Sequence, residues 1–117
     1  MKRITGQKGE RYAAYFLQKK GYQILHQNLY TRFSEIDIIA YKNRRLVFVE
    51  VKSRKSLNNG HPEDAFTRSK YRLLLKSAWH YVQGAGYRGL WRVDLIAIMM
   101  NSFDEVEDIR HYRNVTF

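Results

Sequence analysis

Three charged residues that interrupt two apolar segments carry the clearest chemical signal in the sequence. Asp37 lies within residues 34–40, and Glu50 and Lys52 lie within residues 46–53. Because side chains alternate along a strand, Glu50 and Lys52 share one face of their segment. Carboxylates bind hard cations such as Mg²⁺, and a metal-activated water beside a lysine ammonium is sufficient to hydrolyse a phosphodiester. The alternative is an ordinary ion pair between Glu50 and Lys52.

The two segments are the arms of a predicted β hairpin. Residues 32–41 and 44–53 are rich in β-branched and aromatic side chains, and a short polar stretch separates them. A symmetric turn at residues 43–44 places Asp37 directly opposite Glu50. Like charges in that position destabilise a sheet unless a cation compensates them. The pair therefore predicts a divalent-cation site, expected to hold Mg²⁺ or Mn²⁺.

Two further acids are candidates for the same site. The hairpin register places Glu35 opposite Lys52, as an accessory group of the site or as a cross-strand ion pair. Glu10 lies on an expected helix, three residues before the apolar Ala13, at the edge of the buried stripe. Glu10 either approaches the metal pair when the helix packs on the sheet or interacts only with the dipole of its own helix.

Hydrophobic periodicity predicts the elements that position these residues. Besides the hairpin, we expect a helix over residues 7–20, a strand over 22–29, a helix of about four turns beginning after Thr67, a strand over 90–100 and a last edge strand. The order αβββαβ(β) predicts a single α/β domain over residues 1–117, with a mixed sheet of about 4–5 strands and helices packed on it.

The charge of the chain predicts a polyanionic partner. The 117 residues include 21 Lys and Arg against 11 Asp and Glu, a net charge of +10, and the first 60 residues hold 13 of these bases but only 4 of the acids. Nucleic acid is the expected partner, with DNA favoured over RNA. The lack of cysteine excludes a disulfide framework and a thiolate metal site. We expect a cytoplasmic protein without membrane association, and a homodimer is compatible with the sequence.

Several basic residues are candidates for contacts with nucleic-acid phosphates, and a solvated basic face is their alternative role. These residues are Arg44, Arg45, Arg54, Lys55, Arg68, Lys70 and Arg72. The four histidines lack the close spacing of metal ligands. Asp94 lies in an apolar strand and is expected to be a buried hydrogen-bonding group.

The motifs that hold these candidates resemble those of a known family. An acid on a first helix, an Asp on one strand and Glu-x-Lys on the next are the signature of the PD-(D/E)XK nuclease-like superfamily, and the element order is similar to that of the archaeal Holliday-junction resolvases. The chain is more closely similar to the YraN family of uncharacterised bacterial proteins. That resemblance rests on Gly9-Glu10, Glu35-Ile36-Asp37-Ile38-Ile39-Ala40, Val47-Phe48-Val49-Glu50-Val51-Lys52-Ser53-Arg54, Lys70 and Val93-Asp94.

The resemblance implies a restriction-endonuclease-like fold and a role for each candidate. It assigns Asp37 and Glu50 as metal ligands, Lys52 as the catalytic lysine and Glu10 as the helical acid that assists the metal. The chain departs from the superfamily at Ile36, where the superfamily's name residue is Pro, and from the YraN-like group in having Ser34 before Glu35, where Gly is common. Neither departure removes a ligand.

Two functions follow from these residues. The first is a Mg²⁺-dependent nuclease acting on DNA or structured nucleic acid, with Glu10, Asp37, Glu50 and Lys52 as its catalytic residues. The second is a catalytically silent module that binds nucleic acid or another protein and retains the nuclease fold. Binding of Mg²⁺ or Mn²⁺ at millimolar concentration distinguishes the two.

Overall fold

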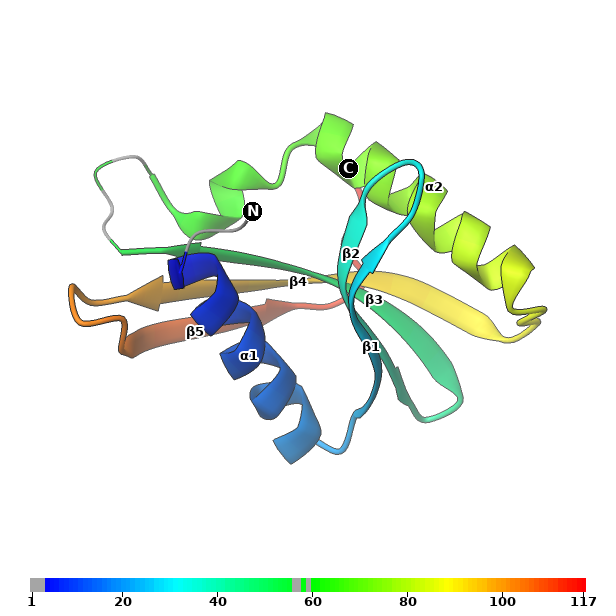
Figure 1. The fold of residues 1–117 in the computed structure, drawn as a ribbon, viewed down its shortest axis with the longest axis horizontal. Helices are drawn as coiled ribbons and strands as arrows, with labels where there is room; N and C mark the ends of the chain where they lie inside the picture. Colours follow the sequence, from blue (N-terminus) through cyan, green and yellow to red (C-terminus); the bar gives the residue numbers. More distant parts are fainter. Residues whose placement is uncertain (1–3, 56–57, 59) are drawn as a thin grey trace.

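The computed structural model describes residues 4–55, 58 and 60–117, and these residues form the α/β fold that the sequence predicts (Figure 1). None of the helices within these ranges is long and apolar enough to cross a bilayer. In chain order the elements are α1 (Ile4–Lys19), β1 (Gln23–Tyr30), β2 (Glu35–Lys42), β3 (Arg45–Arg54), the 3-10 helix η2 (Pro62–Ala65), α2 (Arg68–Gly84), β4 (Leu90–Met100) and β5 (Val106–Tyr112).

The strands form one mixed sheet in the order β1-β2-β3-β4-β5. The pair β3–β4 is parallel, whereas the other three neighbouring pairs are antiparallel. Parallel neighbours need a long crossover connection, and α2 lies within that connection. The sheet therefore confirms the predicted class, and β5 is the expected edge strand.

The ends of the two α-helices follow from local sequence signals. At the C-terminus of α1, Gly21 adopts a positive φ of 92°, and the Tyr22 N–H donates to the carbonyl of Leu17 at 3.0 Å. At the N-terminus of α2, the Thr67 hydroxyl accepts a hydrogen bond from the Lys70 N–H at 3.4 Å. The first helix begins at Ile4, three residues before the predicted start, because helix ends carry weak sequence signals.

Apolar side chains cover both faces of the sheet. Ile38 and Val49 belong to a cluster with Leu17 of α1, whereas their neighbours Ile39 and Phe48 belong to a cluster with residues of α2. This alternation follows from the two-residue period of a strand. The central strands are therefore enclosed between the two helices, and a charged side chain on β2 or β3 must be buried or reach an opening in the sheet.

The β2–β3 hairpin has the predicted register only over part of its length. Lys42 pairs with Arg45 across a two-residue turn at residues 43–44, whose φ values of 52° and 61° are those of a type I′ turn. The ladder continues to Ile38↔Val49 and ends there. From this point β2 pairs only with β1, and β3 pairs only with β4. The two strands therefore separate immediately before the candidate acids.

Candidate metal centre

The separation of β2 and β3 is held in place at the loop between β1 and β2. The hydroxyl groups of Thr31 and Ser34 each lie 2.7 Å from the hydroxyl of Ser77, a buried residue of α2. Figure 1 shows this loop beside α2. These contacts fix the beginning of β2 to α2, so this part of β2 does not pair with the last residues of β3. Ser34 thus makes a structural contact through its own side chain.

Three of the candidate acids gather where the strands separate. Glu10 of α1 and the two acids of β2, Glu35 and Asp37, have carboxylate oxygens within 4.8 Å of one another. Glu10 and Asp37 are each only 6% exposed. An Asp37 oxygen also accepts a hydrogen bond from the Val51 N–H at 2.9 Å, in the place of a ladder bond between the two strands. The structure therefore brings a helical acid and two strand acids to one point.

Glu10 reaches this point because the residue before it is glycine. A Cβ atom at Gly9 would lie 1.9 Å from Ser53 Oγ and 3.1 Å from Ser53 Cβ. Only a residue without a side chain allows the helix backbone to approach β3 so closely. The Ser53 hydroxyl is buried there and has no hydrogen-bond partner among the described residues. Gly9 therefore serves to bring the α1 backbone, with Glu10 on it, against the sheet.

Glu50 joins the cluster through Asp37. Burial, followed by the negative charge of Asp37, raises the pKa of Glu50 to about 7, while Lys52 acts to lower it. The Lys52 ammonium lies 2.9 Å from Glu50 Oε2, and both side chains are largely buried. A carboxyl group with such a pKa releases its proton readily when a cation arrives. We call Glu10, Glu35, Asp37, Glu50 and Lys52 the acid centre.

The arrangement corrects one feature of the predicted register. Asp37 and Glu50 interact as expected, but through their side chains, since both lie beyond the last ladder pair. Glu35 is not placed opposite Lys52 by the ladder and instead lies with Glu10 and Asp37. The reason is the separation of the strands, which moves the beginning of β2 away from β3.

The donor set of the acid centre fits a hard divalent cation. Its four acids offer only oxygen ligands, which Mg²⁺ and Mn²⁺ prefer. Burial, and then the charge of Asp37, raises the pKa of Glu50 to about 7 although Lys52 lies beside it. Asp37 and Glu50, assisted by Glu10 and Glu35, are therefore the residues that would hold such an ion.

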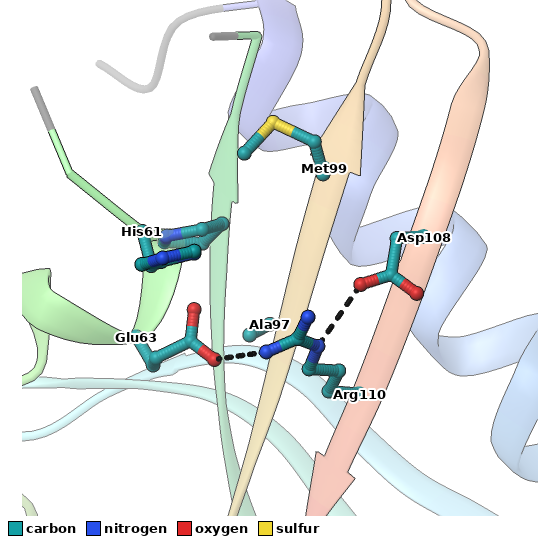
Figure 2. Close-up of a pocket in the computed structure, with 7 residues that line it drawn as sticks. His61, Glu63, Ala97, Met99, Asp108 and Arg110 are labelled. Atoms are coloured by element: carbon teal, nitrogen blue, oxygen red, sulfur yellow. Dashed lines mark hydrogen bonds and ion pairs between the residues drawn. The ribbon is translucent and has the colours of Figure 1, made fainter. Parts of the chain in front are cut away.

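A shallow hollow lies on the sheet surface over β4 and β5 (Figure 2). Its volume is about 190 Å³, and its floor includes Ala97, which pairs with Lys52 in the parallel ladder. Arg110 lies between Glu63 and Asp108 (Figure 2), and its ion pairs with these two acids span 3.7 and 3.0 Å. The charges that line the hollow are thus paired with one another. The hollow gives space next to Lys52 but does not present unpaired cations to a phosphate.

The predicted phosphate-contacting residues do not form a single patch. Arg44 and Arg45 lie at the turn end of β3, whereas Arg54 lies at its other end, nine residues after Arg45. Lys55 follows Arg54 and pairs with Asp104 at 3.0 Å. The remaining three are exposed on the first turns of α2, at Arg68, Lys70 and Arg72. Only Arg54 and Lys55 continue the strand that carries Lys52.

Asp94 is buried and hydrogen-bonded, as the sequence predicts. It has no exposed surface and accepts hydrogen bonds from Arg92 and from the Asn114 N–H, while His111 Nε2 lies 2.7 Å from its Oδ2. Burial acts to raise the pKa of Asp94, but the hydrogen bonds from His111 and Arg92 hold it below its usual value. Sequence reasoning missed these partners, because His111 lies on the neighbouring strand β5 and Asn114 follows it, 17 and 20 residues along the chain from Asp94.

Comparison with known proteins identifies similar chains but no activity. The model of the uncharacterised protein family UPF0102 matches residues 9–98, a range that includes every residue of the acid centre. A UPF0102 protein of Caldicellulosiruptor saccharolyticus is 42% identical over 114 residues, which cover 97% of each chain. A UPF0102 protein of Chloroherpeton thalassium is 43% identical over 111 residues, which cover 89% of this chain and 86% of that one.

Proposed function

The chain belongs to the uncharacterised protein family UPF0102, and we propose that it is a metal-dependent phosphodiesterase of the PD-(D/E)XK type that acts on nucleic acid. The family assignment confirms the YraN-like resemblance of the motifs. The observation that carries the proposed activity is the acid centre itself. Carboxylates from α1, β2 and β3 are buried together beside a lysine, where two strands leave their ladder.

Each residue of the acid centre has a role in such a reaction. Asp37 and Glu50 hold the ion, and Glu10 and Glu35 complete its oxygen surroundings. A bound divalent cation lowers the pKa of a water molecule and stabilises negative charge on the phosphate. Lys52, held by Glu50, places a positive charge where the attacking oxygen or the phosphate acquires negative charge. The separated strands provide the opening through which the substrate approaches.

The charge distribution supports nucleic acid as the substrate, with DNA favoured over RNA. The net charge of +10 attracts a phosphate backbone at long range. Arg54, the last residue of the strand that carries Lys52, is suited to a phosphate contact close to the acid centre. Phosphate contacts of this kind give affinity and position but little sequence preference.

The direct test is cleavage by the purified protein of duplex, single-stranded and branched DNA, and of RNA, in Mg²⁺ or Mn²⁺. We expect Glu50→Ala to lower the rate by at least about 100-fold, because it removes a metal ligand and the partner of Lys52. Glu107→Ala is the matched control, since Glu107 is an exposed acid of β5. Equal background cleavage by all three proteins on every substrate would overturn the proposal.

The ion pair between Lys52 and Glu50 favours a second candidate function. At 2.9 Å it already gives Glu50 a partner, as in a structural salt bridge. A catalytically silent binding module would keep this pair and bind nucleic acid in a salt-dependent manner. For such a module, neither Mg²⁺ nor Asp37→Ala changes the affinity for nucleic acid. For the nuclease, both Mg²⁺ and Asp37→Ala change that affinity.

A further inference from the structure

A second concentration of like charge lies at the opposite end of β3 from Lys52. A hollow of about 270 Å³ is lined by four cationic side chains together with Tyr22 and Asn43. We call these residues the basic pocket, and its cations are Lys42, Arg45, Arg92 and Arg113. They come from the β2–β3 hairpin, the beginning of β4 and the segment after β5. Only Arg45 is among the residues that the sequence predicted to contact phosphate.

Arg92 forms a rigid wall of this pocket. Its Nε and Nη2 atoms donate to the two oxygens of Asp94 at 2.9 and 3.2 Å, and Nη2 also donates to the Tyr22 hydroxyl at 2.9 Å. Asp94 is fully buried and is held in turn by His111 at 2.7 Å. The guanidinium plane is therefore fixed in the direction that these bonds set. Its Nη1 group makes no hydrogen bond to any residue within the described ranges.

The other cations are close to one another without matching acids. Lys42 donates to the carbonyl of Lys20 and lies over the Tyr22 ring, 4.9 Å from its centroid. Arg45 and Arg113 are exposed, and neither pairs with an acid in the part of the chain that the structure describes. Burial, and then the positive charges of Arg113 and Lys42, lower the pKa of the nearby Lys20. The surroundings of the hollow thus carry uncompensated positive charge.

We propose that the basic pocket is a phosphate-binding site distinct from the acid centre. Arginine guanidinium groups bind phosphate through paired N–H donors, and a fixed guanidinium loses little freedom on binding. At about 30 Å³ for each water molecule, the hollow holds roughly nine waters and has room for a phosphate group with part of its hydration. The phosphate is carried either by nucleic acid or by a small phosphorylated compound.

The position of the basic pocket separates it from the proposed reaction. Arg45 and Glu50 are five residues apart on β3, a distance of about 17 Å at the usual rise of a strand. An odd spacing also directs their side chains to opposite faces of the sheet. A phosphate in the pocket is therefore not the one beside Lys52. The inference stands on the pocket's own residues and does not require the acid centre to cleave a substrate.

The test uses the full chain and two kinds of probe in a buffer of constant ionic strength. Calorimetry measures the binding of inorganic phosphate, and fluorescence anisotropy measures the binding of a labelled oligonucleotide. We expect Arg113→Gln and Arg45→Gln each to weaken phosphate binding about tenfold, as the loss of one charge-assisted contact does. Arg88→Gln, which changes an exposed arginine outside the pocket, is the control and is expected to bind like the unchanged protein.

The outcomes separate the two sources of phosphate. If the pocket variants weaken both probes, the phosphate belongs to nucleic acid. If they weaken inorganic phosphate alone, it belongs to a small compound, and both results support the site. An absence of phosphate binding at about 10 mM, or an equal loss in Arg88→Gln, would overturn it. Cleavage assays are independent of this result, so failure of the pocket and failure of the proposed nuclease are distinguishable.

Discussion

The acid centre and the basic pocket both include residues of β3, and each gathers charges of one sign. They differ in how far those charges are exposed to solvent. Asp37 and Glu10 are almost completely buried, whereas Arg45 and Arg113 are exposed to solvent. Charges in a low-dielectric interior interact far more strongly than charges in water. Burial of Glu50, and then the charge of Asp37, raises the pKa of Glu50 to about 7, while the exposed cations of the basic pocket remain screened. A bound cation is therefore expected to stabilise the acid centre more than a bound anion stabilises the basic pocket.

The two regions also differ in how the backbone forms them. The basic pocket lies where the β2–β3 ladder is regular, beside the tight turn at residues 43–44. The acid centre lies where that ladder has ended and a side chain, Asp37, bonds the backbone of β3. Irregular strand positions are common beside functional sites because they redirect side chains. This difference makes the acid centre the more sensitive of the two to changes in packing.

The largest expected effect is that of Lys52→Ala, which should impair catalysis in the acid centre but not metal binding. Lys52→Ala should reduce the rate of nucleic-acid cleavage at least about 100-fold, because it removes the charge that stabilises the reacting oxygen. It should leave divalent-cation binding in place, since lysine is not a metal ligand. Lys76→Ala, at an exposed position of α2, provides the matched control. Retention of the full cleavage rate by Lys52→Ala would remove lysine from the proposed mechanism.

The next effect is a dependence of stability on pH that the basic pocket does not share. The pKa of Glu50 is raised from 4.5 to about 7 in the folded chain, so the folded state holds this proton more tightly than the unfolded state. The free energy of unfolding should therefore fall by up to about 3 kcal/mol as pH rises from about 4.5 to 7 in metal-free buffer. Thermal denaturation across this range measures the fall.

One substitution and one added ion should each abolish most of that dependence of stability on pH. Glu50→Gln removes the titrating group, and saturating Mg²⁺ compensates its charge, stabilising the protein more at pH 8 than at pH 5. Glu107→Gln should retain the slope of the unchanged protein, because Glu107 is an exposed acid. An identical slope in Glu50→Gln and in the unchanged protein would show that Glu50 is not the group responsible.

A third effect tests the close approach of α1 to the acid centre. Gly9→Ala places a Cβ atom 1.9 Å from Ser53 Oγ and should cost about 1–3 kcal/mol of stability, besides weakening cation binding through Glu10. Adding Ser53→Ala should restore part of both losses, because it removes the nearest atom. Gly84→Ala is the control, since nothing lies within 4 Å of a Cβ at that position. Equal stability of Gly9→Ala and Gly84→Ala would contradict the packing role of Gly9.

The smallest effect belongs to the exposed cations. Arg113→Gln removes one of the charges that lower the pKa of Lys20 and should stabilise the protein by less than about 1 kcal/mol at low salt. At about 1 M salt the difference should vanish, because screening then acts over about 3 Å. Chemical denaturation with urea at two salt concentrations measures it. A loss of several kcal/mol would instead assign Arg113 a structural role.

Local signals predicted the order of the elements and the register near the turn. The turn at residues 43–44 accepts positive φ at both positions, and the alternation of apolar residues fixes which face each strand buries. The boundaries of β4, Leu90–Met100, agree with the predicted strand because a long apolar run ends there on both sides. These features depend on residues close together in sequence.

Features that depend on distant contacts could not be predicted in the same way. The end of the β2–β3 ladder depends on the bond between Ser34 and Ser77, 43 residues apart. The placement of Glu35 beside Glu10 follows from it and from the space that Gly9 leaves. The basic pocket requires Arg92 and Arg113, which the fold brings to the hairpin from the other half of the chain. No local pattern marks either arginine as a neighbour of Lys42.

The most direct test of the acid centre is a calorimetric titration of the metal-free protein with Mn²⁺ and with Mg²⁺, alongside Asp37→Asn. The account predicts that a divalent cation binds at millimolar concentration or below, with release of protons near pH 6, and that Asp37→Asn loses this binding. An absence of binding by either ion at millimolar concentration, or equal binding by Asp37→Asn, would contradict the assignment of these acids as a metal centre.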